Sequence, residues 1–271
     1  MSEIVAHHLK DREKIEIYDP TSGSGSLLIT IGKSVAKYTK SKDDIMYYAQ
    51  ELKENTYNLT RMNLVMRGIK PDNIFTRCGD TLEQDWPMYD DVTQEYNPLY
   101  LDAVVSNPPY SQRWDPKHKD TDPRYRYGIA PKGKADYAFL LHDLYHLKPD
   151  GIMTIVLPHG VLFRGDALGG PDGQGEGEGK IRRNLIENNN IEAIIGLPAN
   201  IFFGTGIPTI IMVLRQKREE SDVLFIDASK GFTKVGKTNK LMASDIKRIV
   251  DAVATRPEKI EKFARLVSKE K

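Results

Sequence analysis

Residues 15–28 read IEIYDPTSGSGSLL, and this stretch decides the fold. Its first four residues, 15–18, form a short apolar segment that predicts a β-strand ending at Asp19. A turn rich in glycine and serine follows, and the next apolar pattern predicts a helix that runs to about residue 38. A strand that passes through a glycine turn into a helix is the first unit expected of a parallel α/β sheet.

The same alternation of strands and helices continues along the chain. We expect further strands at residues 45–50, 74–77, 101–105, 152–157, 191–196, 208–214 and 223–226. We expect helices at residues 55–66, 135–147, 244–254 and 258–269, the first of them with Leu59, Met62, Asn63 and Met66 on one face. This pattern predicts a doubly wound, mostly parallel α/β sheet.

Composition excludes several classes of protein. The 39 Lys and Arg are balanced by 38 Asp and Glu, so the chain is not a tail-like or histone-like binder of polyanions, although it can carry a local basic surface. A hydrophobic content of 39% with 28% charged residues is typical of a folded globular chain. The sequence has no apolar run long enough to span a membrane, no secretory signal at its start, and a single cysteine, Cys78, so we expect a cytoplasmic protein.

Four polar residues follow four of the expected strands. Asp19, Glu51, Asp80 and Asn107 recur at intervals of 32, 29 and 27 residues, one strand–helix unit each. Ligands of an open parallel sheet bind outside the carboxyl ends of its strands. We therefore expect these four side chains to line one pocket.

The pocket predicted from these residues fits an adenosine that carries an amino-acid tail and no phosphate. Asp19 can face a cationic amino group, Glu51 can accept from two ribose hydroxyls, and Asp80 can accept from an adenine amine. The third glycine of a dinucleotide fingerprint is replaced by Leu28, and no P-loop lysine follows, so S-adenosylmethionine fits better than NAD or ATP. The turn residues expected to bind this cofactor are Thr21, Ser22, Gly23, Ser24, Gly25 and Ser26.

The segment Asn107-Pro108-Pro109-Tyr110 is the candidate catalytic turn. The Asn107 side-chain oxygen and the Pro108 carbonyl can accept both hydrogens of one exocyclic amine, which directs the nitrogen lone pair toward an electrophilic methyl group. The prolines stiffen the turn, and Tyr110 offers a face on which a planar base can stack. No cluster with metal-ligand spacing is present, since His7, His8, His142 and His146 read as ordinary helix residues, so we expect no metal.

Two long loops interrupt the alternation. Residues 111–134 hold seven Lys or Arg and three Asp, with aromatic residues between them, which suits contact with phosphates and bases. The expected nucleic-acid contacts are Tyr110, Arg113, Arg124, Arg126, Phe202 and Phe203. Residues 165–179 carry seven glycines and are expected to be a flexible surface connector, with a mobile lid as the alternative.

These motifs together resemble a known family. DPTSGSGSLL, YNLTRMNL, GDTL and NPPY resemble the S-adenosylmethionine-dependent DNA adenine-N6 methyltransferases, and IGLPANIFFGTGIPT resembles, more narrowly, the modification (M) subunit of type I restriction–modification systems. The resemblance implies the Rossmann-like sheet of these methyltransferases and transfer of a methyl group from S-adenosylmethionine to N6 of adenine in DNA. Because the target amine is paired inside duplex DNA, the base must also be flipped into the pocket.

The resemblance also implies partners and boundaries. M subunits act with a separate specificity (S) subunit, two M to one S, and a restriction (R) subunit can join them. They are longer than this chain, with an N-terminal helical domain and a Phe-Tyr-Thr-Pro-like motif that packs on the methionine end of the cofactor. We therefore expect a catalytic core, with a methyltransferase domain at residues 1–228 and a helical extension at residues 229–271.

Three other interpretations stay open on the sequence alone. An NPPY enzyme can methylate a glutamine side chain in protein or an amine in RNA, which the long C-terminal half argues against. A core without its N-terminal part can be a scaffold that binds cofactor and partner without turnover. A nicotinamide oxidoreductase is weakened by the absent third glycine.

Overall fold

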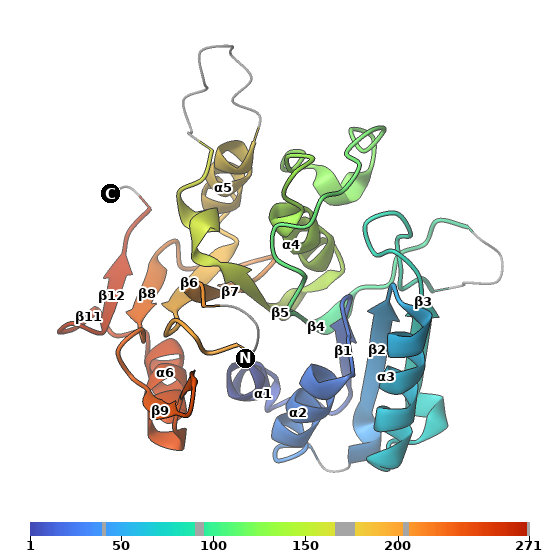
Figure 1. Cartoon of the computed structure of the whole chain (residues 1–271), viewed down its shortest axis with the longest axis horizontal. Helices are drawn as coiled ribbons and strands as arrows, with labels where there is room; N and C mark the ends of the chain where they lie inside the picture. The colour runs from blue at the N-terminus through green and yellow to red at the C-terminus, as the bar shows by residue number, and fades with distance from the viewer. Residues whose placement is uncertain (40–41, 90–94, 166–176, 203–205, 270–271) are drawn as a thin grey trace.

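The computed structural model describes residues 1–39, 42–89, 95–165, 177–202 and 206–269 (Figure 1). Its strands are β1 (Ile15–Asp19), β2 (Ile45–Glu51), β3 (Ile74–Cys78), β4 (Leu101–Ser106), β5 (Leu147–Pro158), β6 (Ile191–Gly196), β7 (Thr209–Leu214), β8 (Val223–Asp227), β9 (Thr233–Val235), β10 (Thr238–Lys240), β11 (Lys259–Ile260) and β12 (Ala264–Val267). Within the described residues, ten of these strands form one sheet in the order β11-β12-β8-β6-β7-β5-β4-β1-β2-β3. The strands β9 and β10 pair separately as a hairpin.

The sheet is mixed and mostly parallel. β3, β2, β1, β4 and β5 run parallel to one another in that spatial order. β7 lies antiparallel between β5 and β6, β8 runs parallel to β6, and β12 lies antiparallel on β8. The predicted α/β sheet is confirmed, and the chain order reverses on either side of β1, which is where an open sheet of this kind forms its ligand crevice.

Helices cover both faces of the sheet (Figure 1). They are α1 (Ser2–Leu9), α2 (Ser26–Val35), α3 (Glu54–Met66), α4 (Asp136–Tyr145), α5 (Glu178–Glu187) and α6 (Ala243–Thr255). One buried cluster joins α1, α2, α6 and Leu64 of α3 to Ile15 and Ile17 of β1, and the other joins α4 and α5 to Tyr18. Successive residues of a strand point to opposite faces, so β1 supplies both cores.

The predicted helix at residues 258–269 is wrong. This segment forms β11 and β12, and Leu266 and Arg265 of β12 lie opposite Leu224 and Phe225 of β8. Lys262 adopts a positive φ of 55°, which a continuous helix does not allow. The open edge of β8 offers unpaired backbone groups, and pairing with them outweighs the helical spacing of the apolar residues. The expected domain boundary at residue 228 stays a prediction.

Helix α3 presents several of its apolar residues to the outside. Leu59, Met62 and Met66, which the sequence places on one face with Asn63, are 44%, 58% and 78% exposed. Thr60 and Leu64 are buried instead. The inward face of α3 is therefore partly polar, and its polar groups meet the glycine turn described below.

Candidate active site

A cavity of about 440 Å³ lies at the carboxyl ends of the parallel strands. Thr21, Glu51, Asp80 and Asn107 all line it, and each comes from the segment that ends or follows one of β1, β2, β3 and β4. The structure thus brings together residues from four of the turns predicted to form one pocket. Its size lies within the range of small-molecule sites, roughly 300–1,000 Å³.

The glycine turn adopts a conformation that needs its glycines. Gly23 and Gly25 have φ of 56° and 75°, in the left-handed region, and a Cβ on Gly25 would lie 3.2 Å from the γ-methyl of Thr60. From α3, the Thr60 hydroxyl donates to the Gly23 carbonyl at 2.5 Å, and the Asn63 amide donates to the Ser24 carbonyl at 2.8 Å. The two side chains of α3 therefore hold the turn open at the start of α2.

Asp19 does not line the cavity, contrary to the prediction that it faces a cofactor amino group. It is 1% exposed, and its Oδ1 accepts from the Thr21 amide at 2.9 Å and from the Thr21 hydroxyl at 3.4 Å. Burial raises its pKa to about 7, against the opposing effect of the two hydrogen bonds from Thr21. In this structure Asp19 stabilises the glycine turn through the hydrogen bonds that it accepts from Thr21.

Glu51 and Asp80 are both tied to the backbone near them. Glu51 accepts from the amides of Gly23 and Lys53, each at 3.0 Å, so that it joins the end of β2 to the glycine turn. Asp80 accepts from the amide of Leu82 at 2.9 Å. Each carboxylate oxygen has two lone pairs, so both residues keep acceptor capacity for hydroxyl or amino groups in the cavity.

The turn Asn107–Tyr110 is anchored at both ends. Before it, the Ser106 hydroxyl donates to the buried carboxyl of Asp143, and after it the Ser111 amide donates to Asp136 at 2.8 Å. Asn107 and Pro109 are exposed and line the cavity, whereas Pro108 is buried. A turn fixed on both sides presents its polar groups in one orientation, which is what electrostatic stabilisation of a reacting group requires.

Within the turn, the Tyr110 hydroxyl donates to the Asn107 side-chain oxygen at 2.9 Å. Burial raises the pKa of Tyr110 to about 12, with a further contribution from Asp136, so the hydroxyl is a neutral donor. It occupies the acceptor that the sequence assigns to a substrate amine. A substrate amine can therefore take the place of this hydroxyl without leaving the oxygen unpaired.

The residues predicted to contact nucleic acid divide into two groups. Arg113 and Arg126 are exposed, and Arg126 stacks over the Tyr127 ring at 4.9 Å. Arg124 is 3% exposed, and its guanidinium donates to the carbonyls of Thr81 and Leu82. The prediction that Arg124 contacts DNA is corrected, because its donors are used inside the protein.

The remaining nucleic-acid candidates come from the segment after β6. Phe202 is half-buried and packs against the core that contains α1 and α2. Phe203 lies outside the described residues, as do residues 166–176 of the glycine-rich loop.

Sequence reasoning missed several lining residues. Pro20, Lys53, Thr56, Gln112 and Phe139 also border the cavity. Phe139 carried only an apolar helical spacing, which marks a core residue as readily as a binding residue. The anchors Thr60, Asn63 and Asp143 sit in helices and have no signal of their own in the sequence.

The expectation that no cluster of metal-ligand type is present is wrong, because Asp85, His142 and His146 place ligand atoms within 4.8 Å of one another. The donor set does not fit a metal ion. His142 Nδ1 accepts from Arg124 at 3.0 Å, and its other ring nitrogen lies 3.0 Å from the Tyr18 hydroxyl, so both ring nitrogens are engaged. A guanidinium in direct contact with a ligand nitrogen opposes a second cation there.

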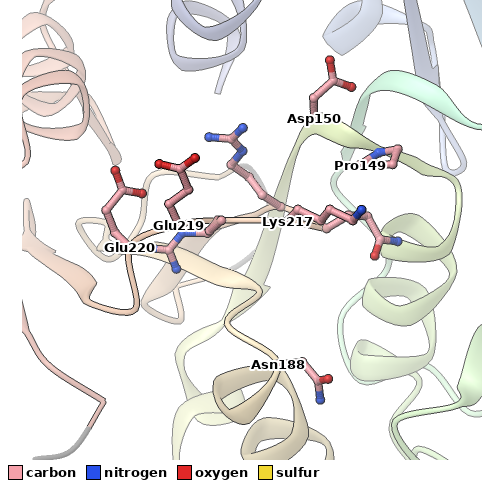
Figure 2. A pocket seen from close by; sticks show the side chains of 9 residues that line it. Pro149, Asp150, Asn188, Lys217, Glu219 and Glu220 are labelled. Carbon is pink, nitrogen blue, oxygen red and sulfur yellow. The ribbon is translucent and has the colours of Figure 1, made fainter.

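A larger cavity of about 700 Å³ lies beside Pro149 and Asp150, near the amino end of β5. Its lining mixes Arg215, Lys217 and Arg218 with the acidic Asp150, Glu219 and Glu220 (Figure 2). None of the predicted catalytic or cofactor residues lines it. It is not the candidate active site.

Within the described part of the chain, no helix has both the length and the apolar character needed to cross a bilayer.

Comparison with known proteins gives a consistent family signal. The family model for N-6 DNA Methylase matches residues 1–271. The chain is 37% identical over 266 residues to the type I restriction enzyme MpnII methylase subunit of Mycoplasma pneumoniae, which covers 94% of this chain and 46% of that protein. It is 31% identical over 244 residues to the HindI methylase subunit of Haemophilus influenzae, covering 88% of this chain and 50% of that protein.

Solved structures agree. The chain superposes with a TM-score of 0.87 and 42% identity on the crystal structure of a type I restriction–modification system methyltransferase subunit from Streptococcus thermophilus. The match covers 99% of this chain and 55% of that one. The chain thus spans about half the length of the relatives that it matches.

Proposed function

This chain belongs to the N-6 DNA methylase family, and we propose that it transfers a methyl group to N6 of adenine in DNA as the modification subunit of a type I restriction–modification complex. One observation carries the proposal: Asn107 and Pro109 border the same cavity as Glu51 and Asp80. An acceptor for a substrate amine thus lies beside acceptors for an adenosine. A methyl donor and a methyl acceptor can then meet in one space.

The residues of the cavity fit S-adenosylmethionine. Two carboxylates, Glu51 and Asp80, and one lysine, Lys53, are the charged groups among the described lining residues. Such a lining suits a cationic, phosphate-free adenosine better than a nucleotide. We infer that Glu51 accepts from the ribose hydroxyls, that Asp80 accepts from the adenine amine, and that residues 21–26 lie against the amino-acid tail.

Bound S-adenosylmethionine would supply the electrophilic methyl group: its bond to sulfur breaks as the bond to nitrogen forms, S-adenosylhomocysteine leaves, and the amine loses one proton. Asn107 Oδ1 and the Pro108 carbonyl accept the two hydrogens of the target amine, which leaves the nitrogen lone pair directed at the cofactor side of the cavity. Both acceptors also stabilise positive charge as it develops on the nitrogen. The Tyr110 ring stacks on the flipped base and offsets part of the free energy lost on unstacking it.

DNA and further subunits complete the proposed assembly. The exposed cations of residues 111–134, Arg113, Lys117, Arg126 and Lys132, offer charge for phosphate contact beside the catalytic turn. Since the formal net charge of the chain is only +1, we propose that much of its DNA affinity comes from an S subunit and a second M subunit, with an R subunit as a further partner. A protein that modifies DNA in this way would work in the cytoplasm.

The proposal is tested by methyl transfer in the assembled complex. We expect Asn107→Ala to remove N6-adenine methylation, because the amine loses its side-chain acceptor, while far-ultraviolet circular dichroism stays unchanged. Asn188→Ala is the matched control, since Asn188 is an exposed asparagine at the other cavity, and it should retain full activity. Unimpaired methylation of adenine by Asn107→Ala, or methylation of protein or RNA in place of DNA by the unaltered complex, would refute the proposal.

A further inference from the structure

Two cations of the loop at residues 111–134 point inward. Arg124 donates to the carbonyls of Thr81 at 2.8 Å and Leu82 at 3.2 Å. Lys119, which is 9% exposed, donates to the same Leu82 carbonyl at 2.9 Å and to the Glu83 carboxylate at 2.9 Å. The loop that leaves the catalytic turn is therefore hydrogen-bonded to the segment that follows β3.

This segment, residues 80–83, forms one wall of the proposed cofactor cavity. Asp80 and Thr81 line the cavity, and the Thr81 hydroxyl donates to the carbonyl of Pro20, another lining residue, at 2.6 Å. The carbonyl of Asp80 accepts from the amides of Glu83 and Gln84 at 3.1 and 2.7 Å. Displacement of the Thr81 and Leu82 carbonyls would thus shift Asp80 itself.

Arg124 is held in a single orientation. Asp122 accepts from its Nε and Nη2 atoms at 2.7–3.1 Å, which forms a bidentate pair. His142 Nδ1 accepts from its Nη1 atom at 3.0 Å, and Asp85 lies 3.8 Å away. A planar guanidinium held in this orientation can donate hydrogen bonds to two successive carbonyls, which a lysine in its place could not do.

The same network reaches the ends of β1 and β2. Because His142 Nδ1 accepts from Arg124, its Nε2 carries the proton and donates to the Tyr18 hydroxyl. Tyr18 in turn donates to Gln50 Oε1 at 2.9 Å, and Gln50 donates to the carbonyl of Gln84 at 3.2 Å. Burial lowers the pKa of His142 well below its usual range, which agrees with a neutral ring.

We propose that Arg124 and Lys119 are positioning residues for the cofactor: they fix the Thr81 and Leu82 carbonyls, and so hold Asp80 and Thr81 in place around the adenosine. This inference rests on the proposed function, since it assumes an adenosine cofactor in the cavity. It assigns the loop two roles that different cations perform. The exposed cations face DNA, and the two buried ones shape the cofactor site.

The test measures cofactor binding separately from turnover and stability. Arg124→Gln and Lys119→Met are compared with Arg126→Gln, an exposed cation of the same loop that serves as the matched control. The measurements are the Kd of S-adenosylhomocysteine by calorimetry, the KM for S-adenosylmethionine and kcat in the assembled complex, and Tm. We expect each buried-site variant to weaken cofactor binding and raise KM by about tenfold, with kcat at saturating cofactor changed by no more than about twofold.

The remaining variants separate positioning from general stabilisation. Arg124→Lys should recover part of the affinity, because one of the two carbonyls regains a donor. Arg126→Gln should leave the Kd of S-adenosylhomocysteine unchanged and weaken DNA binding, with a smaller salt dependence. If Arg124→Gln does not fold, Lys119→Met decides the question.

Two results would overturn the inference in distinguishable ways. A lower Tm with unchanged Kd and KM in the buried-site variants would mean that Arg124 and Lys119 only stabilise the fold, and the proposed function would stand. Absence of binding to S-adenosylhomocysteine by the unaltered assembled complex would remove the proposed function and this inference together.

Discussion

Replacing Asp19 by asparagine tests the free energy of keeping a carboxyl group buried beneath the proposed cofactor site. Asp19 is 1% exposed, and burial raises its pKa from 3.8 to about 7, with Glu51 adding to the effect and the hydrogen bonds from Thr21 opposing it. Asparagine has nearly the same shape, carries no charge, and keeps an oxygen that can accept from the Thr21 amide. The substitution therefore removes the titration and little else.

Proton linkage determines whether the contribution of Asp19 to the free energy of unfolding rises or falls with pH. The pKa is higher in the folded protein than in the unfolded chain, so the unfolded chain releases its proton first as pH rises. The contribution of Asp19 to the free energy of unfolding therefore falls between about pH 4 and pH 7 and is constant above that range. A pKa change from 3.8 to about 7 corresponds to about 4 kcal/mol at most, at roughly 1.4 kcal/mol per pKa unit.

Urea unfolding of both proteins at about pH 5, 6, 7 and 8 measures the effect. We expect the asparagine variant to gain stability relative to the parent across this range, with most of the gain reached by about pH 7. Burial also raises the pKa of Asp143, but this residue is present in both proteins. The pH dependence that it contributes to the free energy of unfolding therefore largely cancels in the difference between them. Asp227→Asn is the control: hydrogen bonds from Ser229 lower the pKa of this exposed residue, so its substitution should give no slope over the same range. A difference for Asp19→Asn that does not vary with pH, or a variant less stable than the parent at about pH 8, would refute the reasoning.

Two further predictions concern the turns that border the cavity. Gly25→Ala should lower the free energy of unfolding by about 1–2 kcal/mol, because alanine disfavours a φ of 75° and its Cβ would lie 3.2 Å from the Thr60 methyl. Adding Thr60→Ser, which removes that methyl and keeps the hydroxyl, should restore part of the loss, as measured by denaturant unfolding. If the effects of the two substitutions were fully additive, the contact between Cβ and the methyl would be contradicted. Tyr110→Phe should keep the rate of DNA methylation within about threefold of the parent, since the ring remains and the substrate amine would replace the hydroxyl on Asn107. Tyr110→Ala should abolish methylation. An equal loss of methylation in both variants would mean that the hydroxyl itself is required.

The sequence located the cavity because parallel strands end at a common edge. Glu51, Asp80 and Asn107 could be placed together from their spacing alone, since each follows a strand of the same sheet. The orientation of Asp19 could not be predicted, because an acid after a strand can serve the turn as well as a ligand. The burial of Arg124 could not be predicted either, because the composition of a basic loop does not show which cations meet carbonyls from a distant segment.

The C-terminal segment shows a different limit of sequence patterns. Apolar residues at positions 260, 263, 264 and 267 have helical spacing, yet the segment pairs as a strand. The difference depends on the free edge of β8, which lies some forty residues earlier in the chain. Local periodicity carries no information about such an edge.

Strand β12 has a consequence for anyone who shortens or fuses this protein. The last residues would look dispensable as a helical appendage, but residues 264–267 cover the backbone of β8 along residues 223–226. Cutting the chain before them would uncover a row of unpaired amide and carbonyl groups beside the exposed ring of Phe225. An uncovered edge of this kind recruits strands from other molecules, so such a truncation would favour aggregation while the cavity residues remained intact.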